Sequence, residues 1–178
     1  IRTAAVHDDN QEVHEAHRRG IPVFERTQAW GALMRGYQNA LCISGTHGKT
    51  TTTSMCTHIM MAAEKDPTVM IGGTLPLLKA CHRVGKGNTI IMESCEYYNS
   101  FLALNPTIAV VLNIEADHLD FFKDLEDIKH SFRCFAERVP AETGTVIANY
   151  DDANTMDALR GIARKVITFG LNAKADVY

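Results

Sequence analysis

The sequence has no excess of basic residues. Its 178 residues include 18 Lys and Arg and 21 Asp and Glu, which gives a formal net charge of -3 and a sequence pI near 6.2. Proteins that bind nucleic acid or an anionic membrane surface usually present a basic face, and this balance provides no argument for one. We therefore expect neither nucleic acid nor a membrane as a partner.

Long apolar runs and paired cysteines are also lacking. The longest uncharged apolar stretch lies around residues 107–114, far short of the roughly 20 residues that span a bilayer. The chain does not open on a basic-then-apolar leader, and we expect a cytoplasmic protein. The cysteines are odd in number and include no C-x-x-C pair, which argues against a disulfide framework and a structural zinc site. The five predicted free thiols are Cys42, Cys56, Cys81, Cys95 and Cys134.

What the sequence does contain is a regular alternation of strand-like and helix-like segments. A composition of 46% hydrophobic and 22% charged residues allows a sizeable core. From residue 40 onward the alternation is typical of a parallel α/β sheet. Two uninterrupted apolar runs, 90–92 and 108–112, are expected for central strands covered on both faces. The sequence thus predicts a mostly parallel sheet flanked by helices. The predicted strands are 40–44, 68–71, 89–93, 108–113, 145–149 and 166–169, and the predicted helices are 49–63, 125–138 and 153–164, with Asp124 and Asp151 as N-caps of the last two.

The first 38 residues do not follow this pattern. A strand-like run over 1–6 precedes a predicted helix over 11–19, which Asn10 caps. A short buried strand over 21–24 and a helix through 30–34 follow. We place a domain junction after this region. Residues 1–38 are then the C-terminal part of one domain, and residues 39–178 are the N-terminal part of the next.

One segment has the context of a phosphate-binding loop, because a buried strand runs into it and a helix follows. Glycines there let backbone amides face the phosphates. Lys49 can place its ammonium against the β and γ phosphates, Thr50 can offer its hydroxyl to Mg²⁺, and the helix directs its positive dipole end at the same anions. The sequence therefore predicts binding of ATP or GTP with Mg²⁺. The predicted nucleotide-binding residues are Gly45, Thr46, His47, Gly48, Lys49, Thr50 and Thr51.

Three motifs in the same order point to a family. The loop, G-T-x-G-K-T-T, departs from the common G-x-x-x-x-G-K-[ST] form because Ile43 stands where the first glycine would be. Two further motifs each follow an apolar strand: Glu93-Ser94-Cys95-Glu96-Tyr97 and Asn113-Ile114-Glu115-Ala116-Asp117-His118-Leu119-Asp120. Together they resemble the Mur ligase family, which includes the folylpolyglutamate synthetases. The resemblance covers nearly the whole chain. It implies a P-loop-type central ATP-binding domain, preceded by the end of a Rossmann-like UDP-binding domain.

The resemblance assigns roles to single residues. It implies that Lys49 contacts the phosphates, that Thr50 and Glu93 hold a first Mg²⁺, and that His118 helps to bind a second one. Glu93 is also sensible by position, because ligands of open α/β sheets bind at the carboxyl ends of the strands. His118 is less expected from chemistry alone, because Mg²⁺ prefers oxygen ligands. The implied catalytic residues are Lys49, Glu93 and His118.

The implied reaction is ATP-dependent amide formation. A substrate carboxylate attacks the γ-phosphate to give an acyl phosphate, and an amino group then displaces phosphate; cations must neutralise the anionic reactants. The motif spelling is most similar to the branch that joins UDP-N-acetylmuramate and L-alanine in peptidoglycan synthesis. Two alternatives stay open. One is the murein tripeptide ligase of cell-wall recycling, and the other is a nucleotide-binding NTPase without ligase activity.

The resemblance also implies a partial chain. In the family the UDP-binding loop lies upstream, and the adenine contacts and amino-acid-binding domain lie downstream. We therefore expect these residues alone to bind nucleotide weakly at best and not to catalyse ligation. Some motif residues stay open: Glu96 suits a supporting role beside Glu93 or plain solvation, and His47 suits a nucleotide contact or a turn. Many relatives carry an acid where this chain has Cys95, and a thiol cannot replace a carboxylate at neutral pH.

Overall fold

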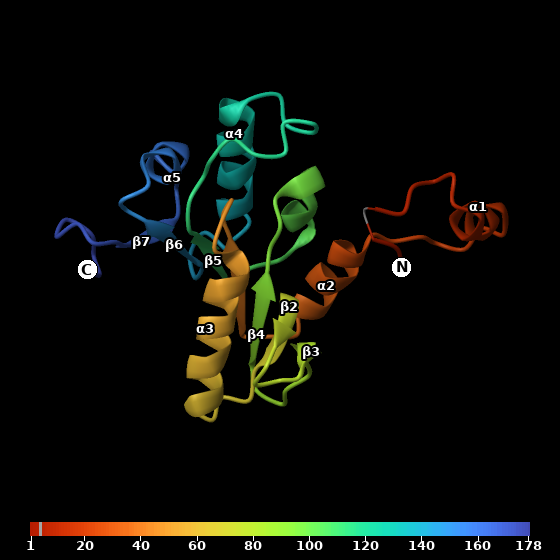
Figure 1. Cartoon of the computed structure of the whole chain (residues 1–178), viewed down its shortest axis with the longest axis horizontal. Coiled ribbons are helices and arrows are strands. Elements are labelled where there is room, and N and C mark those ends of the chain that lie inside the picture. Colours follow the sequence, from red (N-terminus) through yellow and green to blue (C-terminus); the bar gives the residue numbers. More distant parts are fainter. Residues whose placement is uncertain (4) are drawn as a thin grey trace.

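The computed structural model describes residues 1–3 and 5–178, and these form one seven-stranded sheet with flanking helices (Figure 1). The strands are β1 (Asn39–Ser44), β2 (Thr68–Leu75), β3 (Ala80–Arg83), β4 (Thr89–Glu93), β5 (Ile108–Val111), β6 (Thr145–Asn149) and β7 (Lys165–Phe169). Their order in the sheet is β3-β2-β4-β1-β5-β6-β7. Neighbouring strands are parallel except β2 and β3, which are antiparallel. The predicted mostly parallel α/β sheet is confirmed.

Two hydrophobic clusters, one on each face of the sheet, form the core. The larger contains Phe132 and Phe135 of α4 (Leu125–Ala136) with Cys42 of β1. The smaller contains Ile43 of β1, and Met60 of α3 (Lys49–Ala62) packs against it. Successive residues of β1 therefore point into different clusters, so this strand is covered on both faces. That explains why the central strands are apolar without interruption.

The central strands also bring three loops to one edge of the sheet. β1 pairs in parallel with β4 on one side and with β5 on the other. Ile43 lies opposite Glu93, and Ser44 lies opposite Val111. The carboxyl ends of the three strands are thus level, and the segments that follow them start side by side.

Helix α4 shows how local sequence and burial agree. Asp124 is its N-cap, and the Asp124 carboxylate accepts a hydrogen bond from the Asp127 amide at 3.0 Å. Ile128, Phe132 and Phe135 lie on one face and are buried. Full burial of each such side chain contributes about 1.5–3 kcal/mol.

The last helix and two short elements differ from the predictions. Helix α5 (Ala153–Ala158) is shorter than the predicted 153–164. Its N-cap is Asp152, whose carboxylate accepts from the Thr155 amide; the neighbouring Asp151 instead accepts from the Leu171 amide. Strand β3 and the 3-10 helix η1 (Tyr97–Ala103) were not predicted.

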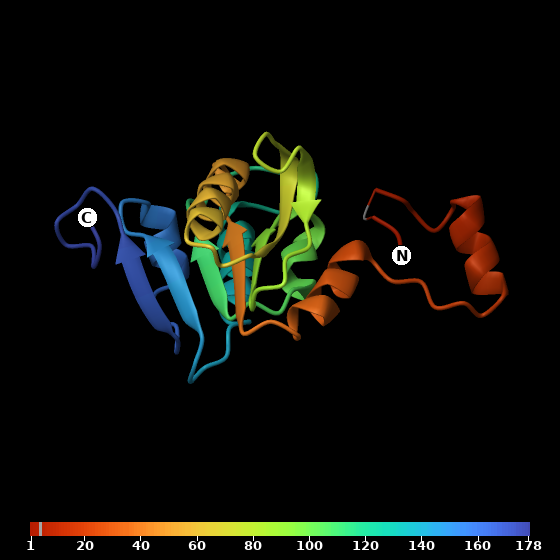
Figure 2. The same ribbon diagram turned by 90° about the horizontal axis from the view of Figure 1, so that it is seen from below.

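The N-terminal residues form an arm that extends away from the sheet (Figure 2). It contains α1 (Gln11–Arg18), capped by Asn10 as predicted, and leads into α2 (Arg26–Met34), whose Met34 is buried in the larger cluster. The predicted buried strand over 21–24 is wrong, because Ile21 and Phe24 are 53% and 52% exposed. Within residues 1–3 and 5–178, the only pairing there is an isolated bridge between Arg2 and Glu25. An apolar run does not become a strand unless a neighbour supplies the ladder.

The remaining predictions concern the opening of the chain and its composition. The predicted strand over 1–6 includes Ala4, which lies outside the described residues. All five cysteines are free thiols, as expected. Among the described helices, none has the length and apolarity to cross a bilayer.

Candidate active site

The loop after β1 turns sharply at two glycines. Gly45 has a φ of +145° and Gly48 has a φ of +83°, both in the region that favours glycine. A Cβ on Gly45 would stand only 2.9 Å from the Cβ of Leu112. Helix α3 begins directly afterwards with Gly48 as its N-cap, and no side chain of the described residues caps it. The first-turn amides and the positive end of the helix dipole are therefore left facing the loop.

Hydrogen bonds hold the loop against the segment that follows β5. The Thr46 amide donates to the Asn113 carbonyl at 3.0 Å, and the Glu115 amide donates to the Thr46 hydroxyl at 2.9 Å. The His47 amide donates to Asn113 Oδ1 at 2.8 Å, and Asn113 Nδ2 donates to the His47 carbonyl at 3.1 Å. The exposed His47 ring lies 3.7 Å from the Glu115 carboxylate. These hydrogen bonds between protein groups fix the conformation of the loop.

The ammonium of Lys49 folds back onto this loop. Lys49 Nζ donates to the Gly45 carbonyl at 2.5 Å and to the Thr46 carbonyl at 3.0 Å. It also lies 3.1 and 3.2 Å from the two carboxylate oxygens of Glu96. The Lys49 side chain is 14% exposed and that of Glu96 is 2% exposed. The pair is therefore largely shielded from water, where its partners interact more strongly than at the surface.

Thr50 and Glu93 meet at the start of α3. The Thr50 hydroxyl donates to Glu93 Oε1 at 2.9 Å, and the Gly72 amide of β2 donates to Glu93 Oε2 at 2.7 Å. A Cβ on Gly72 would stand 2.5 Å from Glu93 Oε1, so glycine leaves room for the carboxylate. The next residue, Thr51, is exposed in the first turn of α3. Hydroxyl and carboxylate oxygens next to a phosphate loop are the ligands that Mg²⁺ prefers.

His118 lies next to Glu96. Its ring stacks on Tyr97 with the ring centroids 4.3 Å apart, and His118 Nε2 lies 3.8 Å from Glu96 Oε1 and 3.9 Å from Asp117 Oδ2. The Tyr97 hydroxyl donates to the Asp120 carboxylate, and this bond raises the pKa of Tyr97. His118 itself has a φ of +52°, in the left-handed region. The stacked tyrosine and the neighbouring carboxylates thus hold the ring in place.

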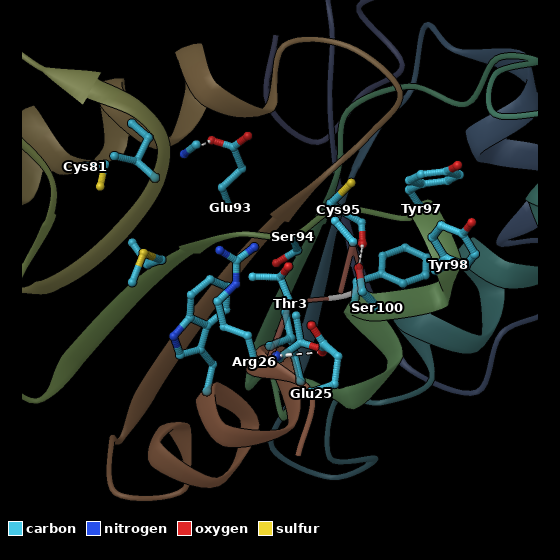
Figure 3. Close-up of a pocket in the computed structure, with 18 of the residues that line it drawn as sticks. Thr3, Glu25, Arg26, Cys81, Glu93, Ser94, Cys95, Tyr97, Tyr98 and Ser100 are labelled. Atoms are coloured by element: carbon cyan, nitrogen blue, oxygen red, sulfur yellow. Dashed lines mark hydrogen bonds between the residues drawn. The ribbon is translucent and has the colours of Figure 1, made fainter. Parts of the chain in front are cut away.

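A cavity of about 790 Å³ opens beside these residues, between the end of β4 and the N-terminal arm. Figure 3 shows Glu93 and Cys95 lining it from the sheet side, and Glu25, the N-cap of α2, and Arg26, its first residue, lining it from the other side. The Arg26 guanidinium lies 4.6 Å from the centre of the Trp30 ring. Desolvation by neighbouring atoms raises the pKa of the Cys95 thiol, although part of this residue is exposed. The thiol therefore stays neutral. The volume of the cavity is typical of a small-molecule site.

The donor set fits a nucleotide-bound Mg²⁺ better than a metal held by protein alone. In the part of the chain that the structure describes, no three His, Cys, Asp or Glu side chains converge on one point. Mg²⁺ at phosphate sites usually takes one or two protein carboxylates and completes its shell with phosphate and water. Thr50 and Glu93 meet that need, and Lys49 adds a cation at the loop. The roles of these residues and of His118 in ligand binding stay predictions.

Glu96 is one of the site residues that the sequence left undecided. Plain solvation is wrong, because the side chain is buried and paired with Lys49. The burial of an acid at this position depends on where η1 and the loop after β1 meet. No spacing in the sequence distinguishes it from the other acids of the motifs.

Replacing Gly45 with alanine is expected to distort the loop. The added Cβ would meet Leu112 and would demand a φ that alanine rarely adopts. We expect a loss of about 1–3 kcal/mol in the free energy of unfolding and at least tenfold weaker nucleotide binding. Urea unfolding and titration with a Mg²⁺–ATP analogue measure the two effects. Gly20→Ala in the arm is the control for a left-handed glycine, because nothing lies within 4 Å of its added Cβ. Wild-type nucleotide affinity in Gly45→Ala would contradict the prediction.

Comparisons with known proteins place the site in context. The model of the Mur ligase middle domain matches residues 43–178. The chain is 46% identical over 176 residues to a UDP-N-acetylmuramate–L-alanine ligase of Caldanaerobacter subterraneus subsp. tengcongensis, covering 99% of this chain and 38% of that protein. It is 48% identical over 174 residues to the same-named ligase of Acetivibrio thermocellus, covering 98% of this chain and 37% of that protein. The chain thus spans about two fifths of the length of these curated relatives.

Solved structures agree with the sequence comparison. The UDP-N-acetylmuramate-alanine ligase of Thermotoga maritima superposes with a TM-score of 0.79 at 26% identity, covering 96% of this chain and 38% of that one. The UDP-N-acetylmuramate:L-alanyl-gamma-D-glutamyl-meso-diaminopimelate ligase of Neisseria meningitides superposes with a TM-score of 0.81 at 27% identity, covering 92% and 56%.

Proposed function

This chain belongs to the Mur ligase family, and from that membership we propose that it forms the ATP-binding part of a ligase joining UDP-N-acetylmuramate to L-alanine. The bond formed is an amide between the carboxylate of the sugar acid and the amino group of alanine. The two solved structures do not separate this reaction from that of the tripeptide ligase, because their identities are 26% and 27%. The curated relatives favour the alanine reaction, with 46% and 48% identity over nearly the whole chain.

The observation that supports ATP chemistry is the meeting of Lys49, Thr50 and Glu93 at the carboxyl edge of the sheet. Lys49 and Thr50 are the first two residues of α3, and Glu93 is the last residue of β4. The Thr50 hydroxyl and the Glu93 carboxylate are 2.9 Å apart, and the Lys49 ammonium rests on the carbonyls of the same loop. A cation and two oxygen donors beside a helix N-terminus are what a Mg²⁺–triphosphate complex requires.

Each residue's part follows from its charge and position. When bound, ATP with Mg²⁺ supplies the γ-phosphoryl group that activates the substrate carboxylate. Lys49 neutralises charge on the phosphates, while Thr50 and Glu93 supply the oxygens that would hold the cation. His118 would help to hold a second Mg²⁺ near the transferred group. We place the substrate carboxylate in the cavity that Glu93 helps to line.

The same proposal covers domain organisation and location. Residues 1–38 would belong to a UDP-substrate-binding domain and residues 39–178 to the ATP-binding domain. Two features support this division: the sheet starts at Asn39, and α1 lies away from it (Figure 2). A cytoplasmic location follows from the supply of ATP, which the reaction consumes.

A chimeric enzyme tests the proposed reaction. The matching 176-residue segment of the Caldanaerobacter ligase is replaced by this chain, and phosphate release is measured. We expect release only when ATP, UDP-N-acetylmuramate and L-alanine are all present, because the amine must complete the amide before phosphate leaves the acyl group. The Lys49→Ala chimera is the control for background release.

Each alternative makes a different pattern in this assay. Release with ATP alone would favour a nucleotide-hydrolysing protein and contradict the ligase proposal. Release that requires the tripeptide L-alanyl-γ-D-glutamyl-meso-diaminopimelate in place of L-alanine would favour the recycling ligase. A chimera that folds and binds ATP but releases no phosphate with any amine would contradict both ligase reactions.

A further inference from the structure

Glu96 carries a carboxylate buried to 2% exposure, and the proposed reaction does not use it. Its side-chain oxygens have two charged or ionisable neighbours among the described residues. Lys49 Nζ lies at 3.1 and 3.2 Å, and His118 Nε2 lies at 3.8 Å. A charge buried to this extent is costly unless it is paired. Neighbouring protein groups, rather than water, must therefore stabilise the Glu96 carboxylate.

The Lys49 ammonium, which pairs with this carboxylate, uses all of its hydrogen-bond donors in contacts with the protein. An ammonium has three N–H donors. Those of Lys49 face the Gly45 carbonyl, the Thr46 carbonyl and the Glu96 carboxylate. None is left for a phosphate oxygen while these contacts hold. A triphosphate can gain Lys49 only by displacing at least one of the three acceptors.

The acceptor that competes most directly with a phosphate is Glu96, because it is the anionic one. We propose that Glu96 is a positioning residue, whose carboxylate holds the Lys49 ammonium against its own loop until phosphate oxygens replace that carboxylate as the acceptor. We call this contact between Glu96 and Lys49 the latch. His118 stays beside the carboxylate, so Glu96 keeps a polar neighbour after Lys49 turns toward the nucleotide. The inference rests on the proposed function only in taking this loop as the nucleotide site.

The latch predicts an unusual effect of Glu96→Gln. This change keeps the shape of the side chain but removes the negative charge that competes for Lys49 and repels phosphate. We expect the 178-residue chain to bind a Mg²⁺–ATP analogue about tenfold more tightly. A purely structural role for Glu96 would instead weaken binding. Calorimetric titration measures the dissociation constants, with circular dichroism as the check on folding.

A second readout needs no nucleotide. Lysine acylation by an N-hydroxysuccinimide ester, followed by mass spectrometry, reports how freely each ammonium leaves its contacts. Lys49 should react several times faster in Glu96→Gln than in the wild type, and exposed Lys86 serves as the internal reference. Glu142→Gln is the matched control, because it removes the same charge from an exposed turn.

The outcomes separate this inference from the proposed function. Weaker nucleotide binding or an unchanged Lys49 acylation rate in folded Glu96→Gln overturns the latch. If the wild type binds no nucleotide, the titration gives the loop assignment no support, while the acylation rates still decide whether Glu96 restrains Lys49. If Glu96→Gln does not fold, Glu96→Asp decides. Its shorter side chain keeps the charge but increases the distance between the carboxylate and the Lys49 ammonium. Faster Lys49 acylation then supports the latch, and an unchanged rate overturns it.

Discussion

Lys49→Ala is expected to abolish nucleotide binding and to destabilise the fold at the same time. The first effect follows because the loop loses the cation that neutralises the phosphates, and we expect at least about 100-fold weaker binding. The second follows because Glu96 is left buried without its charge partner. Breaking a buried pair in this way costs about 3–5 kcal/mol. Titration with a Mg²⁺–ATP analogue and urea unfolding measure the two losses.

A double variant separates the two effects of that substitution. Lys49→Ala combined with Glu96→Gln removes both charges, so part of the lost stability should return while nucleotide binding stays absent. Equal nucleotide affinity in the wild type and Lys49→Ala would contradict the assignment of the loop. Equal unfolding free energies would contradict the importance of the buried pair.

The sheet and the loop were predictable because their signals are local. The apolar runs around Ile91 and Val110 predicted strands covered on both faces, and these strands flank β1 at the centre. The glycines of the motif predicted a loop whose backbone amides can face phosphates, and in the structure Gly45 and Gly48 have positive φ, which glycine adopts easily. The order of strand, loop and helix then placed Lys49 and Thr50 without further information.

Other features depended on residues far away along the chain. The apolar run over 21–24 has strand-like composition, but in the part that the structure describes only Arg2 forms a bridge beside it. η1 contains Tyr98 and Asn99 with positive φ, a conformation that is uncommon for tyrosine and that the local sequence did not predict. Glu96 is buried where η1 meets the loop after β1, and there it contacts Lys49, 47 positions earlier in the chain. Tertiary contacts decided each of these cases.

An aromatic side chain of η1, that of Phe101, connects the site to the core. Phe101 is fully buried, stacks on Phe135 at 4.6 Å and meets the edge of Phe132 at 5.3 Å. Its amide donates to the Cys95 carbonyl at 3.1 Å, which ties η1 to the segment that carries Glu96. These contacts lie between the main hydrophobic cluster and the second motif.

Phe101→Ala is therefore expected to lower the free energy of unfolding by about 3–5 kcal/mol. The loss combines the removed apolar surface, the cavity left behind and the aromatic contacts. Urea unfolding measures it, and Phe121→Ala is the matched control, because Phe121 lies near the same segment but is 36% exposed. We expect the control to cost less than about 1.5 kcal/mol, because an exposed ring loses little burial. Similar unfolding free energies for the two variants would contradict the placement of Phe101 in the core.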